Sequence, residues 1–177
     1  MKKIVAFAGS NSSKSINKQL VTWASSMVLQ AEIELLDLND FEMPIYSMDR
    51  EKGQGIPEEA VSFKDTLKSA DGLMISLAEH NHSYSAAFKN IFDWFSRIER
   101  PIWPDAPMFL MATSPGRRGG QNVLNTAKSA FPHLGAQIVA SFSLPSFYDN
   151  FKADEGITSE ELKATFDEQL AIFNEAI

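Results

Sequence analysis

Short apolar runs alternate with helix-forming segments along the chain, and this alternation is the feature that most constrains the fold. Five runs predict buried strands, at residues 3–8, 31–36, 71–77, 108–112 and 136–141. Most of these runs are continuously apolar, which is typical of strands that are covered on both faces. A chain that alternates strand and helix in this way predicts a parallel sheet with helices on both faces.

Helical spacing of apolar residues predicts the intervening helices. Their expected ranges are 16–30, 57–69, 85–97 and 121–134, followed by a last helix with Leu162, Phe166, Leu170, Phe173 and Ile177 on one face. The stretch 37–55 contains Pro44, Gly53 and Gly55 and predicts a long loop. Long loops in compact domains are often functional.

The length of 177 residues fits one domain spanning residues 1–177. Five strands at this spacing fit an α/β sheet in the order 2-1-3-4-5, in which ligands bind at the carboxyl ends of the strands where the order reverses. That point lies between the first and third strands. We therefore expect the loops after Ala8, Leu77 and Ala112 to converge on a ligand site.

The composition excludes several classes of function. The chain has no cysteine, so it has no disulfide, thiolate metal ligand or thiol nucleophile. The net charge of −7 argues against a nucleic-acid-binding surface. No apolar stretch approaches the roughly 20 residues that a membrane span needs. No basic segment followed by a long apolar run stands at the start, so we expect no signal peptide. We expect a cytoplasmic protein that binds neither membranes nor nucleic acid.

The first of the three loops reads GSNSSKSIN, from Gly9 to Asn17, and is rich in hydroxyl groups. Together with the unpaired N–H groups and partial positive charge at the start of a helix, these residues would form an anion site. The alternative is a hydrophilic turn in which one or two residues cap the helix. The loop has neither the lysine of a P-loop nor a G-x-G-x-x-G pattern.

The second loop reads AEHNHSYS, from Ala78 to Ser85, and the third reads TSPGRRGGQN, from Thr113 to Asn122. Glycines in the third loop let the backbone adopt positive φ angles and approach a flat ligand closely. Taken alone, this loop would be a flexible turn. A histidine pair in the second loop suggests a metal, but no third ligand stands at useful spacing, so we expect no metal site.

Three motifs resemble those of the NAD(P)H-dependent FMN reductase family, which includes quinone, chromate and azo-dye reductases. The family pattern G-S-x-R-x-x-S-x-N is matched at Gly9, Ser10, Ser15 and Asn17. The family pattern P-E-Y-N-x-S with L-K-N-A-I-D-W is similar to AEHNHSYSAAFKNIFDW. The glycine-rich pattern S-P-G-x-x-G-G is similar to SPGRRGG in the third loop.

The resemblance implies a flavodoxin-like three-layer sandwich that binds FMN and uses NADPH or NADH as co-substrate. Hydride would pass through FMN to a small acceptor (a quinone, an azo compound, a metal oxyanion or free flavin), with no catalytic side chain from the protein. It also implies a homodimer or homotetramer. The cofactor-binding residues that it implies are Ser10, Ser12, Ser15, Ile16, Asn17, Glu79, His80, Asn81, Ser83, Ser114, Gly116, Gly119 and Gly120.

Within that set, the resemblance implies separate tasks for the three loops. The FMN phosphate would lie on Ser10, Ser15 and Asn17, and the second loop would run along the flavin ring. The third loop would present N–H groups to the pyrimidine edge of the ring, where reduced flavin tends to carry negative charge.

Some positions depart from the family pattern. Ser12 stands where the family has arginine, which removes a cation from the phosphate region, and Ala78 stands where it has proline. His80 stands in place of tyrosine, and a histidine against the flavin would couple its protonation to the flavin potential. Apolar walls for a flat substrate could come from Phe41, Tyr46, Trp103, Phe147 or Tyr148, although each of these taken singly fits the core or an interface better than the site. The stretch 98–107 is a candidate subunit contact.

Two alternatives to the reductase remain open at this point. One is an electron carrier of the flavodoxin kind, which would pass electrons to a protein partner without turning over nicotinamide. The other is a flavodoxin-like scaffold that has lost its cofactor, for which the replacements at Ser12, Ala78 and His82 leave room.

Overall fold

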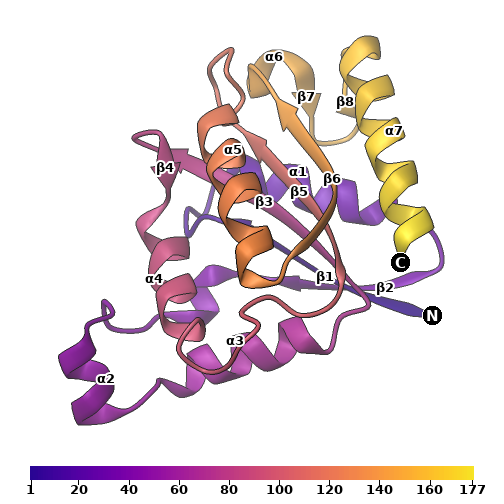
Figure 1. Ribbon diagram of the computed structural model, residues 1–177. Coiled ribbons are helices and arrows are strands. Elements are labelled where there is room, and N and C mark those ends of the chain that lie inside the picture. Colours follow the sequence, from indigo (N-terminus) through magenta and orange to yellow (C-terminus); the bar gives the residue numbers. More distant parts are fainter.

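The computed structural model describes residues 1–177 and has a central parallel sheet (Figure 1). Its long strands are β1 (Lys2–Gly9), β2 (Ala31–Leu36), β3 (Gly72–His80), β5 (Pro107–Thr113) and β6 (Gln137–Leu144). They pair in parallel in the order β2-β1-β3-β5-β6. Numbered as the five long strands, this is the order 2-1-3-4-5, so the prediction of the sheet is confirmed.

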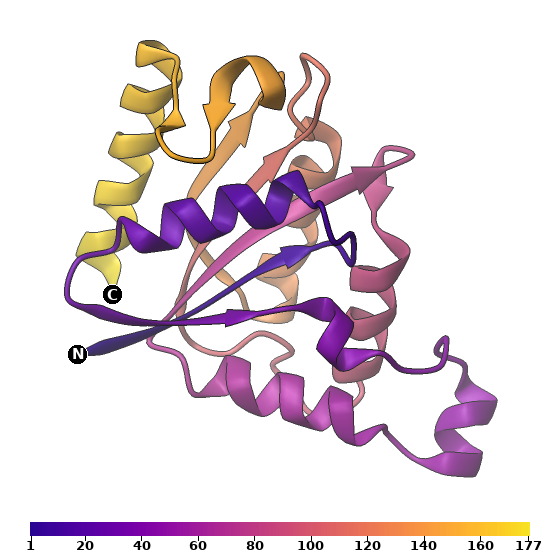
Figure 2. The ribbon, with the colours of Figure 1, turned by 180° about the vertical axis from the view of Figure 1, so that it is seen from behind.

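Helices cover both faces of the sheet (Figures 1 and 2). One face carries α3 (Glu58–Lys68), α4 (Ala86–Phe95) and α5 (Gln121–Ala130). The other face carries α1 (Ile16–Ser26) and α7 (Glu160–Ala176). None of these helices combines the length and the apolar character that crossing a lipid bilayer would require.

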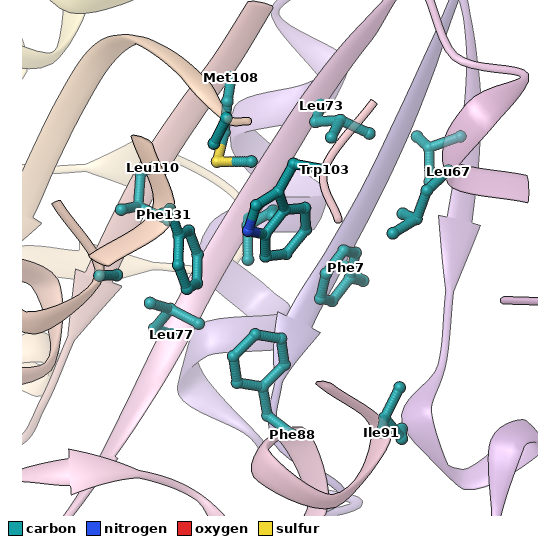
Figure 3. Close-up of a cluster of buried hydrophobic side chains, with 14 of the residues drawn as sticks. Phe7, Leu67, Leu73, Leu77, Phe88, Ile91, Trp103, Met108, Leu110 and Phe131 are labelled. Atoms are coloured by element: carbon teal, nitrogen blue, oxygen red, sulfur yellow. The ribbon is translucent and has the colours of Figure 1, made fainter. Parts of the chain in front are cut away.

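Two hydrophobic cores result because side chains alternate between the faces along each strand. In β1, Val5 and Phe7 point toward α3, α4 and α5, whereas Ala6 points toward α1 and α7. Figure 3 shows part of the first core, where Trp103 packs against Phe131 with ring centroids 4.6 Å apart. Trp103 is fully buried, so of the alternatives open for this residue it is a core residue and does not form a substrate wall.

Several short elements were not expected. The predicted loop at 37–55 contains a 3₁₀ helix, η1 (Leu38–Phe41), and α2 (Met48–Gln54). Because α2 buries none of its residues, it has no apolar stripe that a sequence pattern could show. The remaining short elements are β4 (Ser83–Tyr84), η2 (Phe131–Leu134), α6 (Phe147–Asn150), β7 (Phe151–Lys152) and β8 (Gly156–Ile157).

Two helices end earlier than their periodicity predicts. The helix expected at 16–30 ends at Ser26, where the hydroxyls of Ser25 and Ser26 donate to the carbonyls of the preceding turn. Such local bonds compete with helix continuation. The helix expected at 121–134 ends at Ala130, because Pro132 has no N–H to donate and the chain tightens into η2.

The helix α2 projects from the body beyond α3 and α4 (Figures 1 and 2). The hydroxyl of Tyr46 donates to Glu51 on α2 at 2.8 Å, and Arg97 pairs with the same carboxylate at 3.1 Å. These contacts attach the base of α2 to the end of α4. Ile45 and Met48 remain exposed beside them.

Candidate functional site

The three loops that follow β1, β3 and β5 converge at the carboxyl edge of the sheet. Asn17, in the first turn of α1, donates from its side-chain Nδ2 to the carbonyl of Thr113 at 3.2 Å. Its Oδ1 accepts from the N–H of Thr113 at 3.0 Å and from the hydroxyl of Ser76 at 2.7 Å. One buried amide therefore joins α1 to the middle of β3 and to the end of β5, and the prediction that these loops meet is confirmed.

The second loop is attached to both of its neighbours. The hydroxyl of Ser85, which caps α4, donates to the carbonyl of Gly9 at the end of β1 at 2.7 Å. On the other side, the carboxylate of Glu79 accepts from the N–H of Val123 at 3.0 Å and from Asn122 Nδ2 at 3.1 Å. The second loop thus bridges the first loop and the start of α5.

The first loop leaves hydrogen-bond donors free at the start of α1. Ser15 caps this helix by accepting from the N–H of Lys18 at 3.1 Å. The N–H groups of Ile16 and Asn17 precede the first intrahelical bond and have no partner within the helix. The hydroxyls of Ser10 and Ser12 accept from backbone N–H groups two residues further on, so each keeps its proton to donate.

The side chain of Asn17 is not one of those free donors. It is almost fully buried, and its amide is committed to Ser76 and Thr113. The side-chain amide is therefore not free for a phosphate, and the donor that Asn17 can still offer is its backbone N–H at the start of α1. Ser76 carried a usable signal, because it is the one hydroxyl residue within the apolar run that forms β3.

The second loop is a tight hairpin rather than an open loop. β3 extends to His80 and pairs with Ser83 in an antiparallel bridge. The two turn residues, Asn81 and His82, have φ angles of 50° and 65°. This two-residue turn with positive φ at both positions is the type I′ connection, which suits asparagine and tolerates histidine. All four residues from His80 to Ser83 are exposed.

A hydrogen-bonded cluster fixes this hairpin against α5. Asn122 Nδ2 lies 2.9 Å from His82 Nδ1, and His82 Nδ1 lies 3.6 Å from Glu79 Oε1. Burial of Glu79 on its own would raise the pKa of its carboxyl. The hydrogen bonds from Val123 and Asn122 outweigh burial and hold the pKa of Glu79 below its ordinary value. Glu79 is therefore a carboxylate at neutral pH, placed at the positive end of α5.

Two of the three glycines of the third loop, Gly119 and Gly120, are required by the protein's own packing. Gly119 and Gly120 have φ angles of 57° and 74°. A Cβ on Gly119 would lie 2.5 Å from the Ser143 hydroxyl and 2.8 Å from the backbone nitrogen of Pro145. Gly116 differs, because a Cβ there would meet nothing closer than 3.9 Å. A Cβ on Gly120 would lie 2.9 Å from the Cβ of Ala112 on β5, so at two of the three glycines the close approach of the backbone is made to the protein's own strands, β6 at Gly119 and β5 at Gly120.

A cavity of about 290 Å³ lies beside the first and second loops. Asn11 and His80 line it from the loops, and Phe41 and Met43 line it from the segment after β2. Of the aromatic residues expected as substrate walls, only Phe41 lines this cavity. Phe147 is buried, Tyr46 packs on Trp94, and Tyr148 is 72% exposed next to the third loop.

Asn90 and Trp94, from the second sequence motif, hold the segment that forms one wall of this cavity. Asn90 Oδ1 accepts from the N–H of Tyr46 at 2.8 Å, and its Nδ2 donates to the carbonyl of Met43 at 3.1 Å. The indole N–H of Trp94 donates to the carbonyl of Pro44 at 2.7 Å. Asn90 and Trp94 are therefore structural residues that fix the segment from Met43 to Tyr46.

We predict that Glu79→Gln lowers the free energy of unfolding by about 1 kcal/mol at pH 7, because the ionised carboxylate is the better acceptor at a helix start. The pKa of Glu79 is lower in the folded than in the unfolded protein, where a glutamate has a pKa of about 4.3. The stabilisation is therefore fully present above that pH and is lost as the pH falls through the folded-state pKa. Urea denaturation at pH 7, 5 and 3 should show the two proteins converging. Glu168→Gln, on the exposed face of α7, is the control, and a pH-independent difference would contradict the prediction.

We predict that Gly119→Ala destabilises the protein by about 3 kcal/mol, because the new methyl group meets backbone atoms of β6 and the φ angle is left-handed. Gly116→Ala lies in the same loop but meets no close atom, so its effect should stay within about 0.5 kcal/mol. Urea denaturation midpoints measure both. Equal effects of the two substitutions would show that the loop is not held against β6 in the way described.

Comparison with known proteins adds an independent observation. Residues 2–149 match the family model described as NADPH-dependent FMN reductase. The chain is 26% identical to the NADH:(hydroxy)cinnamate reductase subunit CrdA of Vibrio ruber, over 98% of this chain and 87% of that protein. It is 27% identical to an NADPH:quinone oxidoreductase of Arabidopsis thaliana, over 91% of this chain and 86% of that protein.

Among solved structures, FerB, the flavoenzyme NAD(P)H:(acceptor) oxidoreductase from Paracoccus denitrificans, has the same fold. The two superpose with a TM-score of 0.77 at 24% identity, covering 99% of this chain and 97% of FerB. The family model covers the sheet and all three converging loops. The chain therefore belongs to the NADPH-dependent FMN reductase family.

Proposed function

We propose that this protein transfers hydride from a reduced nicotinamide, through bound FMN, to a small conjugated acceptor such as a quinone. Membership of the family makes the chain an oxidoreductase with FMN as cofactor and NAD(P)H as co-substrate. FMN supplies the redox chemistry when it is bound, since it can accept and donate hydride. The residues of this chain bind, orient and tune it.

The first loop fits the phosphate of FMN. The free N–H groups of Ile16 and Asn17 and the donating hydroxyls of Ser10 and Ser12 form one cluster at the start of α1. A helix start of this kind binds phosphate without a metal and with little formal charge. We assign Ser10, Ser12, Ser15, Ile16 and the backbone of Asn17 to the phosphate. This cluster, at the point where the strand order reverses, is the observation that carries the proposal.

The second and third loops fit the flavin ring. We assign Glu79, His80, Asn81 and Ser83 to one side of it, on the fixed hairpin. We assign Ser114, Gly116, Gly119 and Gly120 to its pyrimidine edge. The N–H groups of Gly116 and Gly120 make no hydrogen bond within the chain, so they are available to the negative charge that develops there on reduction.

The choice of a small acceptor rests on the relatives and on the size of the space beside the loops. The relatives include a quinone oxidoreductase and a (hydroxy)cinnamate reductase subunit, and quinones and cinnamates are small conjugated molecules. The cavity next to His80 has a volume of about 290 Å³ and is lined in part by apolar side chains. Such a space suits a small ring better than a protein partner.

An anaerobic titration tests the proposal. We predict that the purified protein binds FMN, shown by flavin absorption bands, and that NADH or NADPH bleaches them within seconds. Ser10→Glu should weaken FMN binding at least about tenfold, because it places a negative charge against the phosphate. Ser62→Glu, on the exposed face of α3, is the control for added charge.

The outcomes of that titration separate the alternatives. Slow bleaching by both nicotinamides, with a one-electron form on reductive titration, would identify an electron carrier instead. A colourless protein that does not take up added FMN would identify a scaffold without cofactor. Equal FMN binding by Ser10→Glu and Ser62→Glu would remove the first loop from the phosphate site.

The proposal includes a homodimer or homotetramer in the cytoplasm. The oligomer is supported by two large apolar side chains, Ile45 and Met48, which are 75% and 58% exposed at the base of the projecting helix α2. Neighbouring exposed apolar side chains of this kind mark contacts between proteins. We predict a mass of at least twice 19.7 kDa by light scattering, reduced toward 19.7 kDa by Ile45→Glu. A wild-type protein of monomeric mass would contradict this part of the proposal.

A further inference from the structure

A groove of about 520 Å³ lies on the outer side of the third loop. It runs between the first turns of α5, the end of β6 and the start of α7. The residues that line it are Arg117, Arg118, Gln121, Asn122, Asn125, Ser143, Pro145 and Leu162. The lining holds two guanidinium groups, three side-chain amides and one hydroxyl, but no carboxylate.

The two arginines have no anionic partner within the chain. Neither Arg117 nor Arg118 lies within 4.0 Å of a carboxylate, whereas Lys18 and Arg97, for example, are both paired. The chain as a whole carries a net charge of −7. Two neighbouring unpaired cations in a groove without carboxylates therefore form a local positive site on an acidic protein, and such a site attracts anions.

The loop that carries these arginines is held in place on both sides of its tip. The carbonyl of Gly116 accepts from the N–H of Gly119 at 3.1 Å and from the N–H of Ser146 at 3.0 Å. The Ser143 hydroxyl donates to the carbonyl of Gly119 at 3.0 Å. Because the backbone of the tip is fixed before any ligand binds, binding through Arg117 and Arg118 loses less conformational entropy.

The groove is continuous with the site already described. Asn122 lines the groove, and its Nδ2 is also the donor that meets Glu79 and His82. The carboxylate of Glu79 is itself bonded to the N–H of Val123, so it is directed at the start of α5. The groove therefore begins where the hairpin of the second loop meets α5, and it extends from there toward α7.

We propose that this groove binds the phosphate groups of the nicotinamide dinucleotide, with Arg117 and Arg118 as the residues that contact them. The inference rests on the proposed function, since it places the co-substrate of that reaction. Guanidinium groups match phosphate oxygens through paired N–H donors, and they do so better than lysine. The side-chain amides of Gln121 and Asn125 add donors that can serve ribose or phosphate oxygens.

Equilibrium binding of 2′,5′-ADP to the FMN-loaded protein tests this inference by calorimetry. The double variant R117A/R118A should weaken 2′,5′-ADP binding at least about tenfold, because it removes two charge-assisted contacts. The KM for NADPH should rise by a similar factor, and the Kd for FMN should stay unchanged. R117K/R118K should recover part of the loss, because lysine restores the charge without the paired geometry.

Lys128→Ala is the matched control. It removes a cation from the last turn of α5, the helix that follows the third loop, and Lys128 lies outside the groove. It should bind 2′,5′-ADP as the wild type does. Three outcomes would overturn the inference: no measurable binding of 2′,5′-ADP by the wild type, equal binding by R117A/R118A, or an equal loss in Lys128→Ala. A loss of FMN affinity in R117A/R118A would assign the arginines to the flavin and would also overturn it.

The rate at which NADPH reduces the flavin tests the proposed function, whereas the KM for NADPH in R117A/R118A tests the groove. If NADPH bleaches the flavin rapidly in wild type and R117A/R118A with the same KM, the function stands and the groove is not the phosphate site. If NADPH does not reduce the flavin, the proposed function fails whatever the arginines do. A variant that weakens a carboxylate-bearing acceptor but not 2′,5′-ADP would show that the groove serves the acceptor, and would contradict the inference.

Discussion

The hydrogen bonds of one buried amide, that of Asn17, set the geometry on which the site depends. They join the first turn of α1 to Ser76 on β3 and to both backbone groups of Thr113 at the end of β5. An unpaired polar group in this position would cost about 1–3 kcal/mol, so the three elements hold one arrangement. The free N–H groups of α1 are thereby fixed at the point where the strand order reverses.

The second constraint is the carboxylate of Glu79 at the start of α5. Its bonds to Val123 and Asn122 hold the hairpin of the second loop against the helix that follows the third. Its charge also offsets part of the positive potential of that helix start. Two kinds of positive group near the third loop are not offset in this way. They are the free N–H groups of the loop and the unpaired side chains of Arg117 and Arg118. In the proposed function, the fixed hairpin and these positive groups let one edge of an acidic protein receive anionic ligands.

The strands, their order and the convergence of the three loops were predictable because each depends on local patterns and general rules of topology. The role of Asn17 was not, since the sequence motif made it a ligand whereas the fold commits its side chain to a structural bridge. Trp103 stands among prolines in a stretch without periodicity, so the sequence could not decide between the core, an interface and the site, and only the fold placed it in the core. The helix α2 was missed because it buries no side chain. The turn at Asn81 and His82 is visible only once β3 is known to reach His80.

By itself, the sequence determined the alternation of strands and helices, the polar and glycine-rich character of three loops, and the family to which those loops point. Only the tertiary structure decided which polar groups are used within the protein and which remain free for a ligand. The physical reason is that a hydrogen-bond partner is selected by distance in space. Asn17 and Thr113 are 96 residues apart in sequence, and Glu79 and Val123 are 44 apart, yet each pair is in direct contact.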